Sequence, residues 1–314
     1  MDDAAGAVIS EELPPALGGE RLDRIVALLA DVSRSVAAAV IDAGAVRVDG
    51  DVAGSGKVRL AAGSVVDIDT SAIKEPEPPS ADPGVQFAVV QEDESVIVVD
   101  KPAGLVVHPG AGNRDGTLVS GLLARFPDII DVGNRQRPGI VHRLDAGSSG
   151  LLVVARTNEA ATMLMAQFAA HTAGRRYTAL VWGHPAAGHG VIDAPIGRDP
   201  GDPLRMAVVV DGRPARTEYQ VVERLLAPAD VALLTCRLQT GRTHQIRVHL
   251  TGIGHPLVGD STYGDRRISL GLTRPFLHAT ELSFDHPATG ERVTFTSPLP
   301  DDLAALLSTL DRPR

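Results

Sequence analysis

The stretch that decides the fold covers residues 137–155 and reads R-P-G-I-V-H-R-L-D-A-G-S-S-G-L-L-V-V-A. Its first part is a loop punctuated by glycines that carries a single carboxylate, Asp145, and its last part is the apolar run 151–155. Short apolar runs of this kind are typical of buried strands, and glycines allow the sharp turns of such a loop. We therefore expect the loop to present Asp145 at the mouth of a rigid sheet. The alternative is an Asp145 that only hydrogen-bonds within its own turn.

Residues 142–150, H-R-L-D-A-G-S-S-G, resemble the signature H-R-L-D-x-x-[ST]-S-G of the RNA pseudouridine synthases of the RluA/RluD type. The aspartate of that signature is catalytic, and here it stands as Asp145. Four further stretches resemble other motifs of the family in the same order. They are D-K-P-A-G-L at 100–105, R-Y-T-A-L-V-W-G at 176–183, T-G-R-T-H-Q-I-R-V-H at 240–249 and G-H-P-L-V-G-D at 254–260. Several long motifs, spread from about residue 87 to about residue 300, make the resemblance highly specific.

Strand and helix patterns do not alternate regularly beyond residue 85. Candidate buried strands lie at 96–99, 178–182 and 232–240, and Thr157 or Asn158 can cap a helix between two of them. This order predicts a mixed, largely antiparallel sheet. The resemblance implies an α+β protein with the pseudouridine synthase fold, a curved sheet with flanking helices and a central cleft. We assign residues 85–305 to this catalytic domain and residues 306–314 to a C-terminal tail.

A smaller domain is predicted before the proline-rich residues 71–84, which we interpret as a linker. Residues 1–18 carry four acidic residues and a proline pair, and we expect them to form a flexible acidic tail. Within residues 19–70, two helical patterns precede a hairpin signal. This order resembles an S4-type RNA-binding domain, which implies that Arg34 faces RNA. The alternative is a helical cap that only packs on the main domain.

The composition is that of an ordinary globular chain, with 44% hydrophobic and 22% charged residues. No apolar run approaches the roughly 20 residues that span a bilayer, and the acidic N-terminus lacks the pattern of a signal peptide. The single cysteine, Cys236, excludes an internal disulfide. We therefore expect a cytoplasmic protein.

The net charge of −9 argues against an RNA partner unless basic residues are gathered locally. Residues 67–100 hold nine carboxylates and one lysine, a balance of −8, whereas residues 135–156 hold four arginines and one carboxylate, a balance of +3. Residues 237–247 contain three arginines and no acid. The motifs are thus basic islands on an acidic chain, which is compatible with RNA binding.

The resemblance implies the conversion of uridine into pseudouridine, in which the N1–C1′ bond breaks and the uracil is rejoined through C5. Nothing is oxidised and no group is donated, so we expect no cofactor. Asp145 can attack C1′ as a nucleophile or take a proton from the sugar, and the sequence leaves both routes open. A carboxylate in a water-poor cleft needs a cation beside it to stay ionised, and the resemblance implies Arg247 for this part. It also implies that Tyr177 stacks on the uracil and takes the C5 proton.

Arg143 matches the residue that enters RNA at the place of the flipped base, where a guanidinium can recover part of the cost of unstacking. Arg242, His142 and Lys101 are further candidates for RNA binding in the cleft. The ten histidines show neither the H-x-x-x-H spacing nor cysteine partners, so we expect no metal site.

Together these features predict a monomeric RNA pseudouridine synthase of the RluD branch that acts on a stem-loop of 23S ribosomal RNA. One alternative is a transfer RNA or another ribosomal RNA site. Another is a non-catalytic RNA-binding factor of ribosome assembly on the same fold, against which the intact set Asp145, Tyr177 and Arg247 argues.

Overall fold

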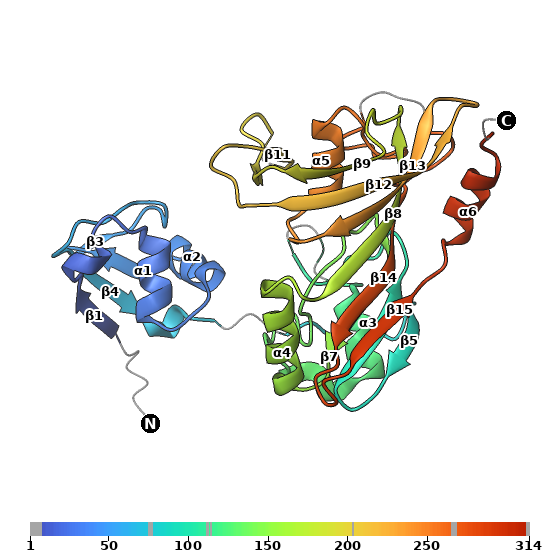
Figure 1. Cartoon of the computed structure of the whole chain (residues 1–314). Helices are drawn as coiled ribbons and strands as arrows, with labels where there is room; N and C mark the ends of the chain where they lie inside the picture. Colours follow the sequence, from blue (N-terminus) through green and yellow to red (C-terminus); the bar gives the residue numbers. More distant parts are fainter. Residues whose placement is uncertain are drawn as a thin grey trace. The chain divides into compact units, whose positions relative to one another are not determined.

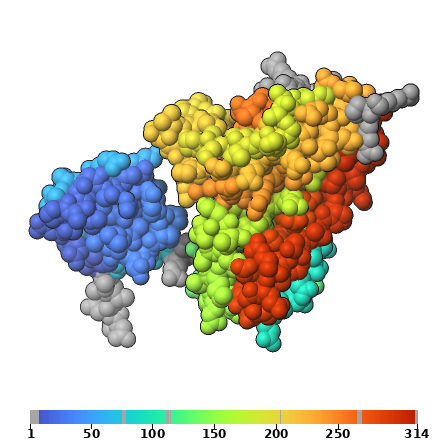
Figure 2. All heavy atoms as spheres, in the orientation of Figure 1, coloured from blue at the N-terminus to red at the C-terminus, as the bar shows by residue number. Residues whose placement is uncertain are grey.

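The computed structural model describes residues 8–74, 78–110, 113, 115–202, 204–264 and 269–311. The chain forms two compact units, Met1–Glu77 and Pro78–Arg314 (Figures 1 and 2). The boundary between them falls within residues 71–84, the stretch interpreted as a linker. Among the described residues, no helix is long and apolar enough to cross a membrane.

The first unit packs two helices on a small antiparallel sheet (Figure 1). The helices are α1 (Leu22–Leu29) and α2 (Arg34–Asp42), and the sheet order is β1-β4-β2-β3. Its strands are β1 (Val8–Glu12), β2 (Val46–Val48), β3 (Asp51–Val52) and β4 (Val65–Asp69), followed by the short 3₁₀ helix η2 (Thr70–Ala72). The Ser33 hydroxyl accepts a hydrogen bond from the Val36 backbone N–H at 3.3 Å and so caps α2.

The prediction of a flexible tail over residues 1–18 is wrong from Val8 onward. Strand β1 pairs with β4 in a register that places Val8 opposite Asp69, and the 3₁₀ helix η1 (Pro15–Leu17) follows it. Leu13 between them is 2% exposed. The partner strand lies more than fifty residues further along the chain, so no local pattern could reveal this pairing. Residues 1–7 lie outside the described residues.

The second unit is built on a nine-stranded sheet in the order β5-β6-β7-β14-β8-β13-β12-β9, with β15 paired to β14 (Figure 1). Among the strand pairs of the described residues, only β7 and β14 run parallel, as the prediction of a mixed, largely antiparallel sheet requires. The strands are β5 (Ala88–Glu92), β6 (Val96–Lys101), β7 (Ser149–Ala155), β8 (Gly174–Trp182), β9 (His189–Asp193), β12 (Arg216–Leu225), β13 (Val231–Leu238), β14 (Leu277–Asp285) and β15 (Arg292–Thr296). A separate hairpin pairs β10 (Ile196–Arg198) with β11 (Met206–Val208).

Four helices accompany this sheet in the described part of the second unit. They are α3 (Leu118–Arg125), α4 (Asn158–Ala169), α5 (Gln245–Gly252) and α6 (Asp301–Ser308), with the 3₁₀ helix η3 (Pro127–Asp131) after α3. Thr157 caps α4 by accepting a hydrogen bond from the Ala160 backbone N–H at 3.1 Å. The structure therefore selects Thr157 of the two predicted caps.

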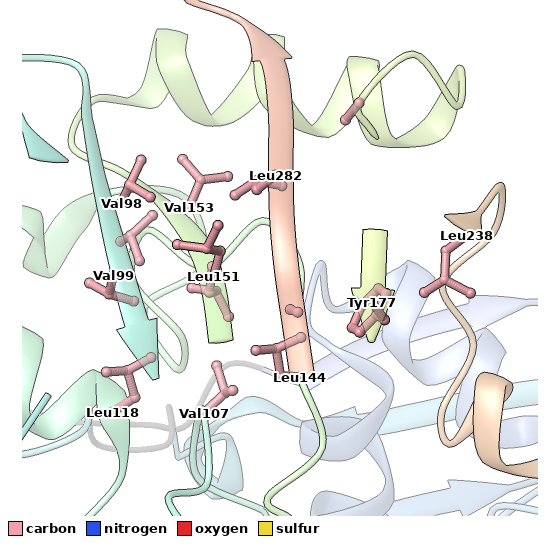
Figure 3. Close-up of a cluster of buried hydrophobic side chains, with 14 of the residues drawn as sticks. Val98, Val99, Val107, Leu118, Leu144, Leu151, Val153, Tyr177, Leu238 and Leu282 are labelled. Carbon is pink, nitrogen blue, oxygen red and sulfur yellow. The ribbon is translucent and has the colours of Figure 1, made fainter. Parts of the chain in front are cut away.

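Strand β7 runs through the middle of the core, and all seven of its residues are buried. Side chains of β6 and β7 meet those of the neighbouring elements in the cluster drawn in Figure 3, where Val99 and Leu151 are labelled beside Leu118 of α3. The same cluster reaches Leu144 and Tyr177. The loop that carries Asp145 is therefore anchored on one side by a close-packed, fully buried strand.

The prediction of a C-terminal tail over residues 306–314 is wrong as far as Asp311. Residues 306–308 belong to α6, and Leu303 and Leu310 are 0% and 6% exposed in an apolar cluster. The backbone of Asp311 exchanges hydrogen bonds with Leu226 and Ala227. The contacting residues lie far apart in the sequence, so the short amphipathic pattern of residues 301–308 does not predict these contacts. Residues 312–314 lie outside the described residues.

Candidate active site

Asp145 lies in the loop that enters β7, at the wall of a cavity of about 660 Å³. Its side chain is 16% exposed. The Ser148 backbone N–H donates to the Asp145 carbonyl at 3.1 Å, and that of Gly104 donates to the Ala146 carbonyl at 2.8 Å. Gly150 has φ +113°, and a Cβ at this position would overlap the backbone of Ala279 on β14. The loop is thus held at both sides, and glycine allows β7 to approach β14 closely.

Arg247 on α5 places its guanidinium between two carboxylates. Its Nε donates to Asp260 Oδ2 at 2.7 Å and its Nη2 donates to Asp260 Oδ1 at 2.9 Å, while its Nη1 lies 3.6 Å from Asp145 Oδ2. Burial lowers the pKa of Arg247, but the hydrogen bonds and charges of Asp260, with the charge of Asp145, raise it above its ordinary value overall. Arg247 therefore stays a cation, and Asp260 fixes the plane in which it faces Asp145.

Tyr177 on β8 is 5% exposed and lines the same cavity. Burial raises the pKa of its phenol to about 12, with Arg175 opposing the shift and Asp145 adding to it. The phenol therefore carries its proton at neutral pH. In this state it suits packing against a base, and it must pass its own proton on before it can accept another.

The cavity is strongly basic. Among its described lining residues there is one carboxylate, Asp145, against five arginines, which are Arg137, Arg143, Arg175, Arg213 and Arg242. The side chain of Arg143 is exposed, and that of Arg242 is half-buried, with its Nε donating to the Pro214 carbonyl at 3.0 Å. Arg137 and Arg143 of one basic island and Arg242 of the other thus meet on one concave surface, which is compatible with an RNA ligand.

His142 forms part of the cavity wall as a neutral ring. It stacks on Phe168 with ring centroids 4.4 Å apart, and its Nε2 accepts a hydrogen bond from the Val153 backbone N–H at 3.0 Å. Burial, with the charge of Arg175, lowers its pKa to about 3. His142 therefore offers no positive charge to RNA, and its candidacy for RNA binding is limited to contact through the ring.

Lys101 does not reach the cavity surface, so its prediction as an RNA-binding residue is wrong. Its side chain is among the largest fully buried ones, with 0% exposure. The ammonium donates to the carbonyls of Pro102 and Leu105 at 2.8 Å each and of Ala146 at 3.2 Å. Burial lowers its pKa to about 7, and Asp145 opposes the shift. Lys101 thus ties the loop of Asp145 to the turn that follows β6.

A family model for RNA pseudouridylate synthases matches residues 95–251, and a model for the S4 domain matches residues 20–66. The first match contains Asp145, Tyr177 and Arg247. The chain belongs to the RNA pseudouridylate synthase family. The resemblance drawn from the sequence motifs is therefore confirmed, and so is the S4 domain ahead of the catalytic one.

Relatives of this pseudouridine synthase cover almost the whole chain. The ribosomal large subunit pseudouridine synthase D of Pseudomonas aeruginosa is 45% identical over 316 residues, which cover 96% of this chain and 96% of that protein. An uncharacterized RNA pseudouridine synthase of Chloroflexus aurantiacus is 48% identical over 309 residues, 95% of this chain and 92% of that one. The solved structure of the human RNA pseudouridylate synthase domain containing 1 superposes with a TM-score of 0.60 at 28% identity, covering 73% of this chain and 89% of that chain.

In the S4 domain of this synthase, Arg34 begins α2 and its side chain is 57% exposed. Its Nη2 lies 3.0 Å from each carboxylate oxygen of Asp23, which Arg21 also contacts. Asp23 thereby gathers two guanidinium groups at one place, and its pKa is lowered, first by the hydrogen bond from Arg21. Whether Arg34 contacts RNA stays a prediction.

Sequence reasoning missed two functional candidates of the synthase. Neither Asp260, the last residue of the motif at 254–260, nor Arg175 was among the predicted site residues, although Asp260 holds Arg247. Arg175 and Tyr177 stand two apart on β8 and therefore project to the same face of the sheet. This alternation was the available signal. Among the described residues, no group of His, Cys, Asp and Glu side chains has the arrangement of a metal site.

Proposed function

We propose that this protein isomerises uridine to pseudouridine in a stem-loop of 23S ribosomal RNA. The observation that carries the proposal is the ion pair with Arg247 made by Asp145, a residue of a cavity wall that also holds five arginines. A single carboxylate among cations suits a reaction at a sugar carbon of a polyanion. The choice of ribosomal RNA rests on the similarity to proteins named ribosomal large subunit pseudouridine synthase D.

In this proposal Asp145 begins the reaction as a carboxylate. In one route its oxygen bonds to C1′ while the N1–C1′ electrons stay on the uracil. In the other it takes a proton from the sugar, and the same bond breaks by elimination. Arg247 keeps Asp145 ionised during its approach to the sugar. After the uracil has turned, C5 bonds to C1′ and the carboxylate is released or returns its proton.

Tyr177 packs against the uracil and receives the proton that leaves C5. Its phenol can do this only if its own proton is transferred in the same step, because burial keeps the phenol protonated at neutral pH. The residues that hold the RNA are Arg143 and Arg242 at the cavity and Arg34 in the S4 domain. Arg143 fills the place of the extruded base.

We further propose that the protein acts as a monomer in the cytoplasm, without metal or cofactor. The isomerisation moves one bond within a nucleotide and involves no net oxidation, so no redox group is required. The S4 domain supplies a second contact to RNA on the same chain, which raises the effective concentration of RNA at the catalytic domain.

The decisive experiment measures tritium release from RNA labelled at C5 of uridine, with 23S, 16S and transfer RNA compared. Release from 23S RNA by the wild type and none by Asp145→Asn is the expected result. Release from transfer RNA alone would favour the alternative substrate. RNA binding without any release would favour a non-catalytic assembly factor and would refute the proposed chemistry.

A further inference from the structure

Arg175 is a buried cation that faces the cavity without a polar partner in the described structure. It is 8% exposed and lines the cavity, and its Nε–H is fully buried and donates to no acceptor. No carboxylate pairs with it among the described residues. Its close neighbour is Phe168, whose ring centroid lies 5.3 Å from the guanidinium carbon. An unpaired charge is strongly disfavoured in a protein interior, so a further anion is the expected partner.

Asp145 is the one carboxylate among the described lining residues of the cavity. Its Oδ2 already lies 3.6 Å from Nη1 of Arg247. Burial lowers the pKa of Arg175, and Tyr177 is the only group that opposes this shift. No carboxylate in the part of the chain that the structure describes forms an ion pair with Arg175. A ligand that enters the cavity can supply the negative charge.

Arg242 and Arg213 line the same cavity as Arg175. The charges of Arg213 and Arg175, after burial, lower the pKa of Arg242. Like charges gathered without an acid between them mark a place for an anion. Gly241 keeps this place open, because a Cβ there would lie 2.5 Å from Nη1 of Arg175.

We propose that Arg175, together with Arg242, binds the RNA phosphodiester next to the target uridine. The inference rests on the proposed function in taking RNA as the substrate. Arg175 and Tyr177 point to the same face of β8, and residues two apart on a strand are separated by about 7 Å. This spacing suits a nucleotide whose base meets Tyr177 and whose phosphate meets Arg175. The planar guanidinium can then give two parallel hydrogen bonds to the phosphate oxygens.

The test is a double-mutant cycle between Arg175 and single phosphates of a short RNA stem-loop. Each phosphate beside the target uridine is replaced in turn by a neutral methylphosphonate. For the wild type, one replacement should lower kcat/KM and RNA affinity by about 10- to 100-fold, the range of a charge-assisted hydrogen bond. For Arg175→Gln, the same replacement should have almost no further effect, because the partner is already gone. Arg175→Lys should retain part of the affinity through its charge.

Arg176→Gln is the matched control, because Arg176 is the adjacent residue on the opposite face of β8 and pairs with Glu281 at 3.0 Å. It should leave the phosphate effect at its wild-type size. Melting curves check that each variant is folded, and if Arg175→Gln is not, the cycle is run with Arg175→Lys.

Equal phosphate effects in the wild type and in the Arg175 variants would overturn the inference. An Arg175→Met variant with wild-type kcat/KM and RNA affinity would also overturn it, since it would show that the side chain only packs on Phe168. The measurement of RNA affinity in the cycle also separates this inference from the proposed function. If the wild type binds the stem-loop but releases no tritium, the catalytic proposal fails while the cycle in affinity still decides on Arg175.

Discussion

The guanidinium Nη1 of Arg247 lies 3.6 Å from the carboxylate Oδ2 of Asp145, whereas the same guanidinium makes two hydrogen bonds to Asp260 of 2.7 and 2.9 Å. Arg247 is therefore held by Asp260 and only attracted by Asp145, since 3.6 Å is too long for a hydrogen bond. The arrangement keeps Asp145 charged without locking its oxygens. A carboxylate that has to reach a substrate atom needs this freedom.

Replacement of Asp145 by Asn should abolish pseudouridine formation and leave folding and RNA binding intact. The amide has nearly the same size but is neither a nucleophile for C1′ nor a base for the sugar proton. Tritium release and a filter-binding assay measure the two properties. Arg247→Ala should be severe alone and cost little further in the Asn background, because the pair is already broken. Turnover by freshly prepared Asp145→Asn, free of deamidation, would contradict the mechanism.

Replacement of Tyr177 by Phe should separate binding from proton transfer. The ring still packs against the uracil, so RNA affinity should change by less than about 3-fold, whereas kcat should fall by at least about 100-fold, as for loss of a general acid or base. Single-turnover kinetics with the labelled stem-loop measure both. An unchanged kcat would show that Tyr177 only stacks.

Lys101→Met should change the pH dependence of stability. Burial lowers the pKa of Lys101 from 10.5 to about 7. Between these values the unfolded chain binds a proton that the folded protein does not, so the free energy of unfolding rises with pH by up to about 1.4 kcal/mol per unit through this residue. Relative to Lys101→Met, the wild type should therefore gain stability from about pH 7 upward.

Urea titrations at several pH values measure this difference, and Lys57→Met, at an exposed lysine of the S4 domain, serves as the control. A difference between wild type and Lys101→Met that does not vary with pH would show that Lys101 is neutral or charged in both states alike. The carbonyl of Ala146 loses its bond to the ammonium in Lys101→Met, so a fall in kcat should accompany the change.

Removal of residues 1–77 should leave chemistry on a short stem-loop intact and reduce discrimination among long RNAs. Asp145, Tyr177, Arg247 and the cavity all belong to the unit Pro78–Arg314. Turnover is compared on the stem-loop and on 23S RNA against an excess of transfer RNA. Loss of activity on both substrates by a folded truncated protein would contradict this division of labour.

The sequence by itself determined the family, the order of the domains and the position of the catalytic loop. These depend on local features, because a long motif around Asp145 and an apolar run behind it need no distant contact to be recognised. The start of α4 also follows from a local feature, since the hydroxyl of Thr157, one of the two predicted capping residues, bonds an N–H group three residues away.

Only the tertiary structure decided which charged residues are partnered and which are exposed. Lys101 looked like an RNA-binding cation, yet three carbonyls from two loops surround it. Strand β1 and residues 306–311 looked like tails, yet β4 and the Leu226–Ala227 backbone hold them. Arg175 shows the reverse case, a buried cation with no hydrogen-bonding or ionic partner in the described part of its unit. Burial and pairing arise from residues far apart in the chain, and a linear pattern carries no record of those distances.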